Sequence, residues 1–428
     1  MMNYQVKAST LRGDIVIPPS KSHTLRAILF ASLAGGESII HHPLDSPDAT
    51  AMMRACELLG AKIQLQKNQI IISGVAGKPR SPADVIDAGN SGIVLRFIAA
   101  VAALTSGDAV ITGDDSIRTN RPIKPLLEGL TQLNASAVSM KGDGYAPIMI
   151  KGPLQAGEAH LNGEDSQPVS ALLIAAAFVS GATTIHVSNP GEKPWIDLTL
   201  DWFDRLGIKY ERKGYAKYQI FGGSRYAGFE YDVPGDFSSA AFSLVAALIT
   251  HSELTLHHLD WNDSQGDKAI FSILEKMGAQ FVIYPEKKCI CVKKSERLKG
   301  ITIDINDCID ALPILSVLAC FAEGETRLTG AAIARAKECD RLSAMTQELQ
   351  KMGAMISEMH DGLIIQGAPL HGATVESHND HRVALSLAVA ALATPGEITI
   401  LNTNCITKSY PNFANNFQKI GANIEVLS

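Results

Sequence analysis

Residues 18–23 of the chain read Pro-Pro-Ser-Lys-Ser-His, a polar loop between a short expected strand and an Ala/Leu-rich stretch that favours helix. Residues 234–239, Pro-Gly-Asp-Phe-Ser-Ser, form a similar opening in the second half of the chain. Ser, Asp and Asn at such points are typical N-cap residues, whose side chains accept hydrogen bonds from the first free N–H groups of a helix. Each opening therefore predicts a helix start and, through the helix dipole, a candidate anion site.

This kind of opening occurs six times along the chain. The other four copies are Asp-Ala-Gly-Asn-Ser-Gly (87–92), Gly-Glu-Asp-Ser-Gln-Pro (163–168), Asn-Asp-Cys-Ile-Asp-Ala (306–311) and Ser-His-Asn-Asp-His-Arg (377–382). Helices that end in a Gly-Ala-x-apolar or related turn also recur along the chain. These turns lie roughly seventy residues apart, at Gly60, Asn134, Gly207, Gly278, Gly353 and Gly421. This period is too long for a solenoid repeat, and it predicts six copies of a compact α/β module.

The composition of the 428 residues is globular, with 46% hydrophobic and 19% charged residues, and the length favours two domains. The net charge of −6 argues against a nucleic-acid binder, which would usually be basic. The apolar runs 97–104 and 171–179 are about half a membrane span, so we expect buried helices. Seven scattered cysteines without Cys-x-x-Cys, and a start without an apolar signal segment, predict a reduced, cytoplasmic protein.

Several openings carry more charge than a helix cap requires. Lys21 and Arg26 follow the first opening, Arg96 follows the second, and Arg382 ends the sixth. Six bare caps would be scaffold, whereas caps surrounded by Lys, Arg and Asp indicate a binding site for an anionic ligand.

Nine short motifs resemble, in order, the signatures of the enolpyruvyl transferase family, in particular the branch that acts on shikimate-3-phosphate. They are Pro-Ser-Lys-Ser-x-x-x-Arg (19–26), Gly-Asn-Ser-Gly-x-x-x-Arg (89–96) with Arg121-Pro122 downstream, Ser-Gln (166–167), Lys-Pro-Trp-Ile-Asp (193–197), Pro-Gly-Asp-x-Ser-Ser-Ala (234–240), Asp310, Lys-Glu-Cys-Asp-Arg (337–341), Asn-Asp-His-Arg (379–382) and Lys408. Each motif is weak alone, but their common order from residue 18 to residue 411 covers almost the whole chain.

The resemblance implies an α/β fold, a two-domain inside-out α/β barrel of six βαβαββ-type repeats, three in each domain. The family's active site lies in the interdomain cleft. One domain would be discontinuous and comprise residues 1–19 and 235–428, and the other would comprise residues 20–234. The chain would cross between the domains at residues 17–20 and 233–236, which are themselves a similar pair.

The activity that the resemblance implies is transfer of the enolpyruvyl group of phosphoenolpyruvate to the 5-hydroxyl of shikimate-3-phosphate, with release of phosphate. This addition–elimination reaction passes through a tetrahedral intermediate and belongs to the shikimate pathway, which leads to chorismate and the aromatic amino acids. The implied enzyme uses no cofactor and no metal, binds neither nucleic acid nor membrane, and is a monomer.

The resemblance also implies roles for single residues. Asp310 matches the proton acceptor, and Glu338 and Lys21 match its proton-transfer partners. The residues that match the phosphoenolpyruvate site are Lys21, Gly92, Arg121, Gln167, Arg341, Arg382 and Lys408. Those that match the shikimate-3-phosphate site are Lys21, Ser22, Arg26, Ser166, Gln167, Asp310 and Lys337.

Two acidic residues depart from the family pattern, because Asp165 and Glu192 stand where the family usually has serines near the acceptor's phosphate. A carboxylate about 5 Å from a phosphate would repel it by roughly 3 kcal/mol per charge pair. We therefore expect these side chains to turn away or to pair with a cation such as Lys193, unless the acceptor is unphosphorylated. A branch of the family from intracellular bacteria is similar in carrying acids there. Arg118 is a second candidate for the role of Arg121, since the preceding stretch is one residue longer.

Other functions remain as alternatives. An enolpyruvyl transferase acting on UDP-N-acetylglucosamine would usually carry a reactive cysteine before its Arg-Pro motif, and residues 57–288 contain none. Asp165 and Glu192 leave open an unphosphorylated cyclic hydroxy acid as acceptor, and the third alternative is a non-catalytic anion-binding relative. His378-x-x-His381 lacks a clustered third ligand for a metal. The acidic residues at 260, 263 and 267 are interpreted as a polar turn.

Overall fold

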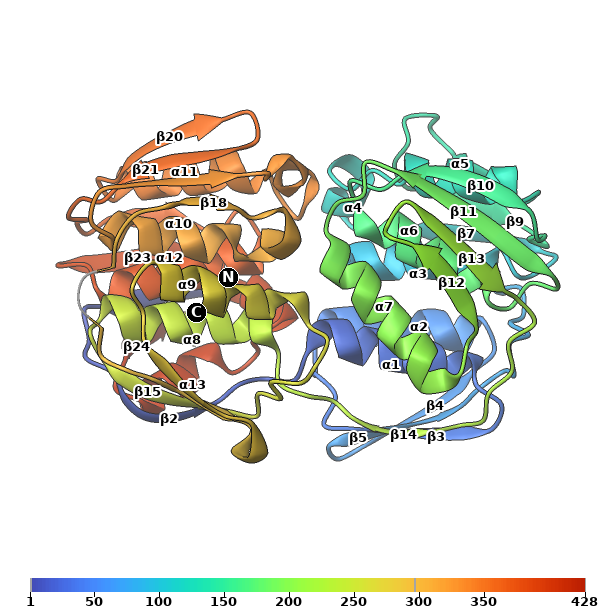
Figure 1. Ribbon diagram of the computed structural model, residues 1–428, viewed down its shortest axis with the longest axis horizontal. Coiled ribbons are helices and arrows are strands. Elements are labelled where there is room, and N and C mark those ends of the chain that lie inside the picture. Colours follow the sequence, from blue (N-terminus) through green and yellow to red (C-terminus); the bar gives the residue numbers. More distant parts are fainter. Residues whose placement is uncertain (1, 296–297, 428) are drawn as a thin grey trace. The chain divides into compact units, whose positions relative to one another are not determined.

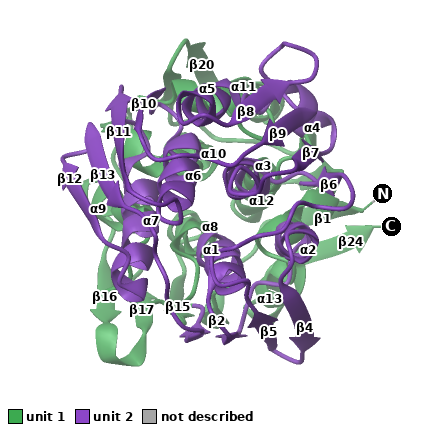
Figure 2. Cartoon of the chain, turned by 90° about the vertical axis from the view of Figure 1, so that its right-hand side faces the viewer, with its two compact units in different colours: residues 1–20, 234–428 green, residues 21–233 purple. Residues whose placement is uncertain are grey.

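The computed structural model describes residues 2–295 and 298–427. It divides into two compact units, residues 1–20 with 234–428 and residues 21–233, which we call the C-unit and the N-unit (Figure 2). Each limit lies one residue from a domain boundary that the sequence predicts.

Each unit contains three copies of one module, which is built from the elements strand, helix, strand, helix, strand, strand. In the N-unit the second copy comprises β6 (Ile86–Asp87), α3 (Gly92–Ala102), β7 (Asp108–Thr112), α5 (Lys124–Gln132), β8 (Ser136–Ser139) and β9 (Ile148–Lys151). Its sheet has the order β6-β7-β9-β8, with the first pair parallel and the other two antiparallel. All six four-stranded sheets in the described residues share this order and these directions.

The N-unit contains two further modules and one short extra helix. The first module comprises α1 (Lys21–Leu33), β3 (Glu37–His41), α2 (Pro47–Leu58), β4 (Lys62–Gln66), β5 (Gln69–Ser73) and β14 (Glu230–Asp232). The third comprises β10 (Glu158–Asn162), α6 (Ser166–Ala176), β11 (Ala182–Ser188), α7 (Lys193–Leu206), β12 (Tyr210–Lys213) and β13 (Lys217–Phe221). The extra helix is α4 (Asp115–Thr119).

The three modules of the C-unit also carry 3₁₀ helices in their loops. The fourth module comprises β2 (Arg12–Val16), α8 (Phe237–Ile249), β15 (Glu253–His257), η1 (Gly266–Lys268), α9 (Ala269–Lys276), β16 (Phe281–Tyr284), η2 (Pro285–Lys287) and β17 (Cys289–Val292). The fifth comprises β18 (Thr302–Asp304), η3 (Asn306–Ala311), α10 (Leu312–Phe321), β19 (Glu325–Thr329), η4 (Ala332–Ala336), α11 (Arg341–Lys351), β20 (Met355–Met359) and β21 (Gly362–Gln366). The sixth comprises β22 (Thr374–Glu376), α12 (His381–Leu392), β23 (Glu397–Leu401), η5 (Thr403–Lys408), α13 (Phe413–Lys419), β24 (Asn423–Leu427) and β1 (Asn3–Lys7).

Three of the modules take one strand from a distant part of the chain. β14 closes the first sheet beside β3, β2 closes the fourth beside β15, and β1 lies between β23 and β24. The two crossing segments lie side by side and are joined by an antiparallel bridge between Pro19 and Gly235. Ser20 N donates to the Pro234 carbonyl at 2.8 Å, and Asp236 N donates to the Pro18 carbonyl at 2.9 Å.

The first helix of each module lies in the core of its unit, and the sheets lie outside (Figure 1). Every residue of α8 and α12 is buried, and α3 and α6 are buried along nearly their whole length. Their Ala-rich sequences let neighbouring helices approach closely, while strands such as β11 alternate buried and more exposed residues. The expectation of buried helices within residues 97–104 and 171–179 is confirmed. Among the described residues, no helix is both long and apolar enough to cross a bilayer.

The turn predictions are confirmed at all six positions, since Gly60, Asn134, Gly207, Gly278, Gly353 and Gly421 have positive φ angles. Glycine and asparagine tolerate this left-handed conformation, which ends a helix.

The predicted N-caps are present at the second, third, fourth and sixth openings. Ser91, Asp165, Asp236 and Asp380 each accept a hydrogen bond from a backbone N–H of the helix that follows. The prediction is wrong at the fifth opening. Residues 306–311 form η3 there, and α10 follows directly from Ala311, which has no side-chain acceptor.

Candidate active site

The C-unit contains a buried cluster of charges around Arg341, the first residue of α11, which is 1% exposed. Its guanidinium donates to three carboxylates at 2.8 Å each: Nη1 to Asp310, Nη2 to Glu338 and Nε to Asp380. These acids come from η3, from the residues just before α11 and from the N-cap of α12. We call this set, with Arg382 and Lys408, the Arg341 cluster.

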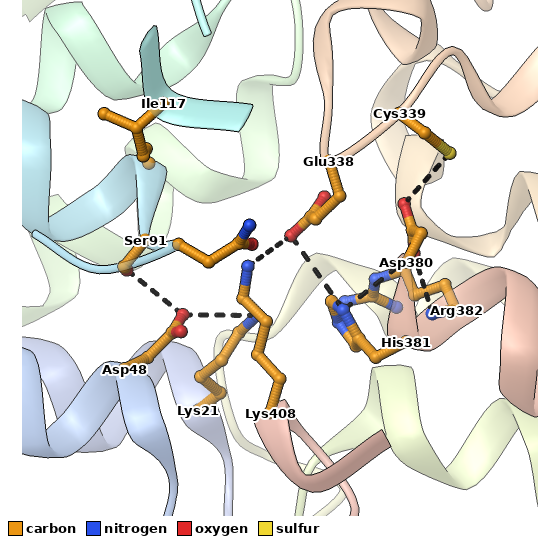
Figure 3. A network of polar contacts seen from close by, with 12 residues as sticks. Lys21, Asp48, Ser91, Ile117, Glu338, Cys339, Asp380, His381, Arg382 and Lys408 are labelled. Carbon is orange, nitrogen blue, oxygen red and sulfur yellow. Dashed lines mark hydrogen bonds and ion pairs between the residues drawn. The ribbon is translucent and has the colours of Figure 1, made fainter. Parts of the chain in front are cut away.

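Glu338 also binds a lysine, as Figure 3 shows. Its Oε1 accepts from Lys408 Nζ at 2.7 Å, while its Oε2 accepts from Arg341. His381 Nδ1 lies 3.9 Å from both Glu338 and Asp380. Both Glu338 and Lys408 are buried, so their charges are only weakly screened. The structure thus places a carboxylate and an ammonium group in direct contact, and an ion pair of this kind is able to exchange a proton.

Asp310 lies between two arginines of the same unit. Its Oδ1 accepts from Arg341, and its Oδ2 is 2.9 Å from Arg382 Nη2. Burial alone would raise the pKa of Asp310, but the charges of Arg382, Arg341 and Lys337 outweigh burial and hold it well below its usual range. Asp310 is therefore ionised in the free protein and strongly paired with cations.

Arg382 is held by the start of its own helix and by a neighbouring one. Its backbone N–H donates to the Asp380 cap at 2.8 Å, and its Nη1 donates to Ser238 Oγ on α8. Lys337, also buried, is the residue that follows η4. The structure thus brings together five of the predicted residues in the C-unit, and the sixth, Lys337, contributes its charge to Asp310.

Asp267, which the sequence analysis interpreted as part of a polar turn, lies in η1. Its carboxylate is buried, and burial followed by the negative charge of Asp310 raises its pKa to about 7. Arg382 and Asp236 are the next charges that act on it. No local pattern marks Asp267, because its environment comes from η3, α8 and α12, which are distant in sequence.

In the N-unit, three side chains converge on Gly92 at the start of α3. A Cβ atom added there would lie 2.7 Å from Arg121 Nη1, 2.7 Å from Arg96 Nη1 and 3.2 Å from Gln167 Oε1. Arg96 Nη1 itself donates to Gln167 Oε1 at 3.0 Å. Glycine is needed here because a larger residue would fill the space in front of the two arginines.

The two candidate arginines after α3 lie in different environments. Arg121 is buried beside Gly92, whereas Arg118 lies in α4 and donates to the Gly113 carbonyl. Of these two arginines, Arg121 is therefore the one that lies beside Gly92.

Lys21, the first residue of α1, lies 3.8 Å from Asp48 in α2, and both side chains are mostly buried. Asp48 also accepts from Ser91 Oγ at 3.1 Å, so it links Lys21 to the start of α3 (Figure 3). The sequence analysis missed Asp48. It follows the capping residue Ser46 by two positions, and this resembles an ordinary helix start.

Arg26 is fully buried in α1 and bonds to oxygen atoms that carry no charge. It donates to Thr199 Oγ1 at 3.1 and 3.0 Å and to the carbonyls of Trp195 and Ser22, and its guanidinium lies over the Phe97 ring. Burial lowers the pKa of Arg26 to about 9, which leaves it charged at neutral pH. Within the part of the chain that the structure describes, its hydrogen bonds go to no carboxylate.

The departures Asp165 and Glu192 lie on both sides of Ser166, at the start of α6. Asp165 pairs with Arg96 Nη2 at 3.0 Å, so the expectation that this side chain pairs with a cation is confirmed, with Arg96 as a partner. Glu192 Oε2 accepts from both Ser166 N and Ser166 Oγ, at 3.0 and 3.1 Å. Asp165 meets Arg96 because α6 packs against α3, and the local sequence does not show this contact.

Two sets of residues are possible metal ligands, the pair His378 and His381 and a group on β10 and β11. His378 Nε2 donates to the Glu348 carboxylate at 2.8 Å, so this ring nitrogen is engaged by a group of the protein. In the described residues, one group has the spacing of a metal-ligand set, namely Glu158, His160 and His186 on β10 and β11. None of these three belongs to the predicted substrate or catalytic residues.

Comparisons with known proteins identify the family. The model of the family "EPSP synthase (3-phosphoshikimate 1-carboxyvinyltransferase)" matches residues 6–417. A curated 3-phosphoshikimate 1-carboxyvinyltransferase of Acetivibrio thermocellus is 44% identical, covering 99% of both chains. One of Chlamydia caviae is also 44% identical, covering 99% of this chain and 95% of the relative.

The fold comparison agrees with the sequence comparisons. The solved structure of EPSP synthase from Acinetobacter baumannii matches with a TM-score of 0.83 and 30% identity, and all of both chains is covered. This match and the six sheets confirm the expected two-domain inside-out α/β barrel of six repeats. The chain therefore belongs to the EPSP synthase (3-phosphoshikimate 1-carboxyvinyltransferase) family.

Proposed function

We propose that this enzyme transfers the enolpyruvyl group of phosphoenolpyruvate to the 5-hydroxyl of shikimate-3-phosphate and releases phosphate. The names of relatives that are similar over their full length support this activity and its place in the shikimate pathway. The observation that carries the proposal is Asp310, a partly exposed carboxylate held between two buried arginines that can each bind an anionic substrate. Shikimate-3-phosphate and phosphoenolpyruvate are both polyanions, and arginine binds carboxylate and phosphate through paired N–H groups.

The reaction has an addition step and an elimination step. In addition, the 5-oxygen bonds to C2 of phosphoenolpyruvate, the hydroxyl proton leaves, and C3 gains a proton. In elimination, C3 loses a proton and the bond between C2 and the phosphate oxygen breaks. Asp310 accepts the hydroxyl proton in this proposal, and Lys21 and Glu338 transfer protons at C3.

The ion pairs of Asp310 link substrate binding to its basicity. In the free protein the arginines hold its pKa well below the usual range, so Asp310 is a weak base. When Arg341 and Arg382 bind the carboxylate and phosphate of phosphoenolpyruvate, they interact less with Asp310. Its pKa then rises toward the ordinary range, and it becomes a better acceptor for the hydroxyl proton.

The substrate residues are proposed from the sequence motifs, with support from their local geometry. For phosphoenolpyruvate they are Lys21, Gly92, Arg121, Gln167, Arg341, Arg382 and Lys408. For shikimate-3-phosphate they are Lys21, Ser22, Arg26, Ser166, Gln167, Asp310 and Lys337. We further propose that the C-unit and the N-unit are the two domains of a cytoplasmic monomer and that residues of both take part in the reaction.

The test is phosphate release from phosphoenolpyruvate with shikimate-3-phosphate, with plain shikimate or with no acceptor. We expect release with the phosphorylated acceptor alone. Lys21→Met should lower turnover at least ~100-fold, the scale of a lost proton-transfer group. Lys67→Met, at an exposed position in the same unit, should leave turnover unchanged.

Two results would contradict the proposal. Phosphate release with shikimate but not with shikimate-3-phosphate would show that the acceptor is unphosphorylated. Normal turnover by Lys21→Met would remove Lys21 from the reaction.

A further inference from the structure

The donors at the start of α6 are occupied by carboxylates of the chain itself. Ser166 gives both its backbone N–H and its hydroxyl to Glu192 Oε2, at 3.0 and 3.1 Å, and Glu192 is only 3% exposed. The next N–H, that of Gln167, donates to Asp165 Oδ1 at 2.9 Å. The start of a helix attracts anions, and here Glu192 holds the position that an anionic ligand of Ser166 would take.

Asp165 and Glu192 differ in how they are held. Asp165 is the N-cap of α6, and its second oxygen binds Arg96, which in turn donates to Gln167. Asp165 is thus part of the framework that positions Gln167. Glu192 comes from the segment before α7 and reaches Ser166 from outside the helix.

The backbone at Glu192 is left-handed, with φ of 45° and ψ of 40°. A residue with a Cβ atom is disfavoured in this conformation, and glycine or asparagine would adopt it more easily. Glu192 also makes no side-chain cap bond to its own helix α7. Neither the local backbone nor the cap of α7 therefore explains a glutamate here, whereas its contact with Ser166 does.

We propose that Glu192 lowers the affinity for the acceptor by competing with an anionic group of the acceptor for the two donors of Ser166. This inference rests on the proposed function, in which Ser166 binds shikimate-3-phosphate. To reach Ser166, the phosphate or the carboxylate of the acceptor displaces the Glu192 side chain. Acceptor binding is therefore weaker than a serine or glutamine at position 192 would allow.

The experiment compares the wild type with Glu192→Ser and Glu192→Gln. KM for shikimate-3-phosphate should fall by about tenfold in Glu192→Ser, because one buried like charge is removed. Glu192→Gln keeps the shape and loses the charge, so its KM should fall as well. KM for phosphoenolpyruvate should stay within about twofold, since no competing charge is removed from that substrate's residues.

Two further measurements separate local competition from other effects. Glu164→Gln removes one charge at an exposed position two residues before Ser166, and its KM should equal that of the wild type. Calorimetric titration with shikimate-3-phosphate alone should show tighter binding to both Glu192 variants, independently of turnover. Plain shikimate distinguishes the two anionic groups, because tighter binding of shikimate as well would identify the carboxylate as the competitor.

The outcomes distinguish this inference from the proposed function. If the wild type releases no phosphate with shikimate-3-phosphate, the proposed function fails whatever the variants do. If the wild type is active but KM and the binding constant are unchanged or raised in both folded Glu192 variants, the inference is overturned. A fall of equal size in the KM of Glu164→Gln for shikimate-3-phosphate would also overturn the inference, because the change in net charge alone would then explain the effect.

Discussion

Asp310 and Arg341 form a 2.8 Å ion pair in which the arginine is almost completely buried. The same carboxylate is 2.9 Å from Arg382 through its other oxygen. Arg341 also pairs with Glu338 and Asp380, so removal of either partner would leave the other with fewer opposite charges around it. The proposed base and the proposed substrate-binding arginines therefore depend on each other in the free protein.

The first prediction concerns Asp310 itself. Asp310→Asn should lower kcat at least ~100-fold, because the side chain can no longer accept a proton. Asp307→Asn, at an exposed position of the same 3₁₀ helix, is the matched control and should keep full activity. Steady-state phosphate release measures both, and near-normal turnover in Asp310→Asn would remove Asp310 from the mechanism.

The pH profile is a second prediction. The low pKa of Asp310 in the free protein means that protonation of Asp310 should reduce kcat/KM only in strongly acidic solution. In the substrate complex the arginines bind phosphoenolpyruvate, so the pKa of Asp310 is higher. The acid limb of kcat should then lie at higher pH than that of kcat/KM. Coincident limbs would show that substrate binding does not change the charge around Asp310.

The third prediction concerns the pair Glu338–Lys408. Glu338→Gln and Lys408→Met should each destabilise the protein, because each variant removes an opposite charge from a buried charged side chain. The double variant should be less destabilised than the sum, with a coupling of at least ~1 kcal/mol. Urea denaturation gives the four free energies of unfolding. The same cycle on the exposed pair Glu325–Arg327 should give a coupling energy under about 1 kcal/mol. Equal coupling energies for the two pairs would contradict the prediction that burial strengthens the Glu338–Lys408 pair.

Gly92→Ala is the fourth prediction. The new Cβ atom would lie 2.7 Å from Arg121 and Arg96 nitrogens, so both guanidinium groups must shift. KM for phosphoenolpyruvate should rise by about tenfold or more, because the displaced guanidinium groups can no longer form well-aligned paired hydrogen bonds with the anion. Gly157→Ala meets only an ordinary 3.5 Å contact and should leave KM unchanged. An unchanged KM for phosphoenolpyruvate in Gly92→Ala would show that this substrate does not bind beside Gly92.

The fifth prediction concerns stability and pH at Glu348. Burial would raise its pKa, but Lys351, the N–H of Glu376 and His378 outweigh burial and lower it. A lowered pKa in the folded state stabilises the protein above the pKa of the unfolded state and loses this effect as the pH falls through the folded value. Glu348→Gln should therefore be less stable than the wild type above about pH 5, and the difference should shrink in acid. A difference that does not change with pH would contradict this origin.

Much of the fold could be predicted from local sequence signals. The six turns were visible because glycine and asparagine adopt positive φ angles more easily than other residues. The second, third, fourth and sixth openings were correctly identified as capped helix starts, because a cap and its helix are neighbours in sequence. The fifth opening differs because η3 precedes α10, and Asn and Asp favour caps and short turns almost equally.

The sequence by itself determined the six modules, their helix ends and most members of the Arg341 cluster, because motifs and caps act over a few residues. Only the tertiary structure decided which charges meet. Asp48 binds Ser91, Arg96 binds Asp165, and Glu192 takes the donors of Ser166. These partners are 26 to 69 positions apart, and they meet because buried helices pack side by side within one unit. The charge that each site presents is therefore a property of helix packing, which no local pattern specifies.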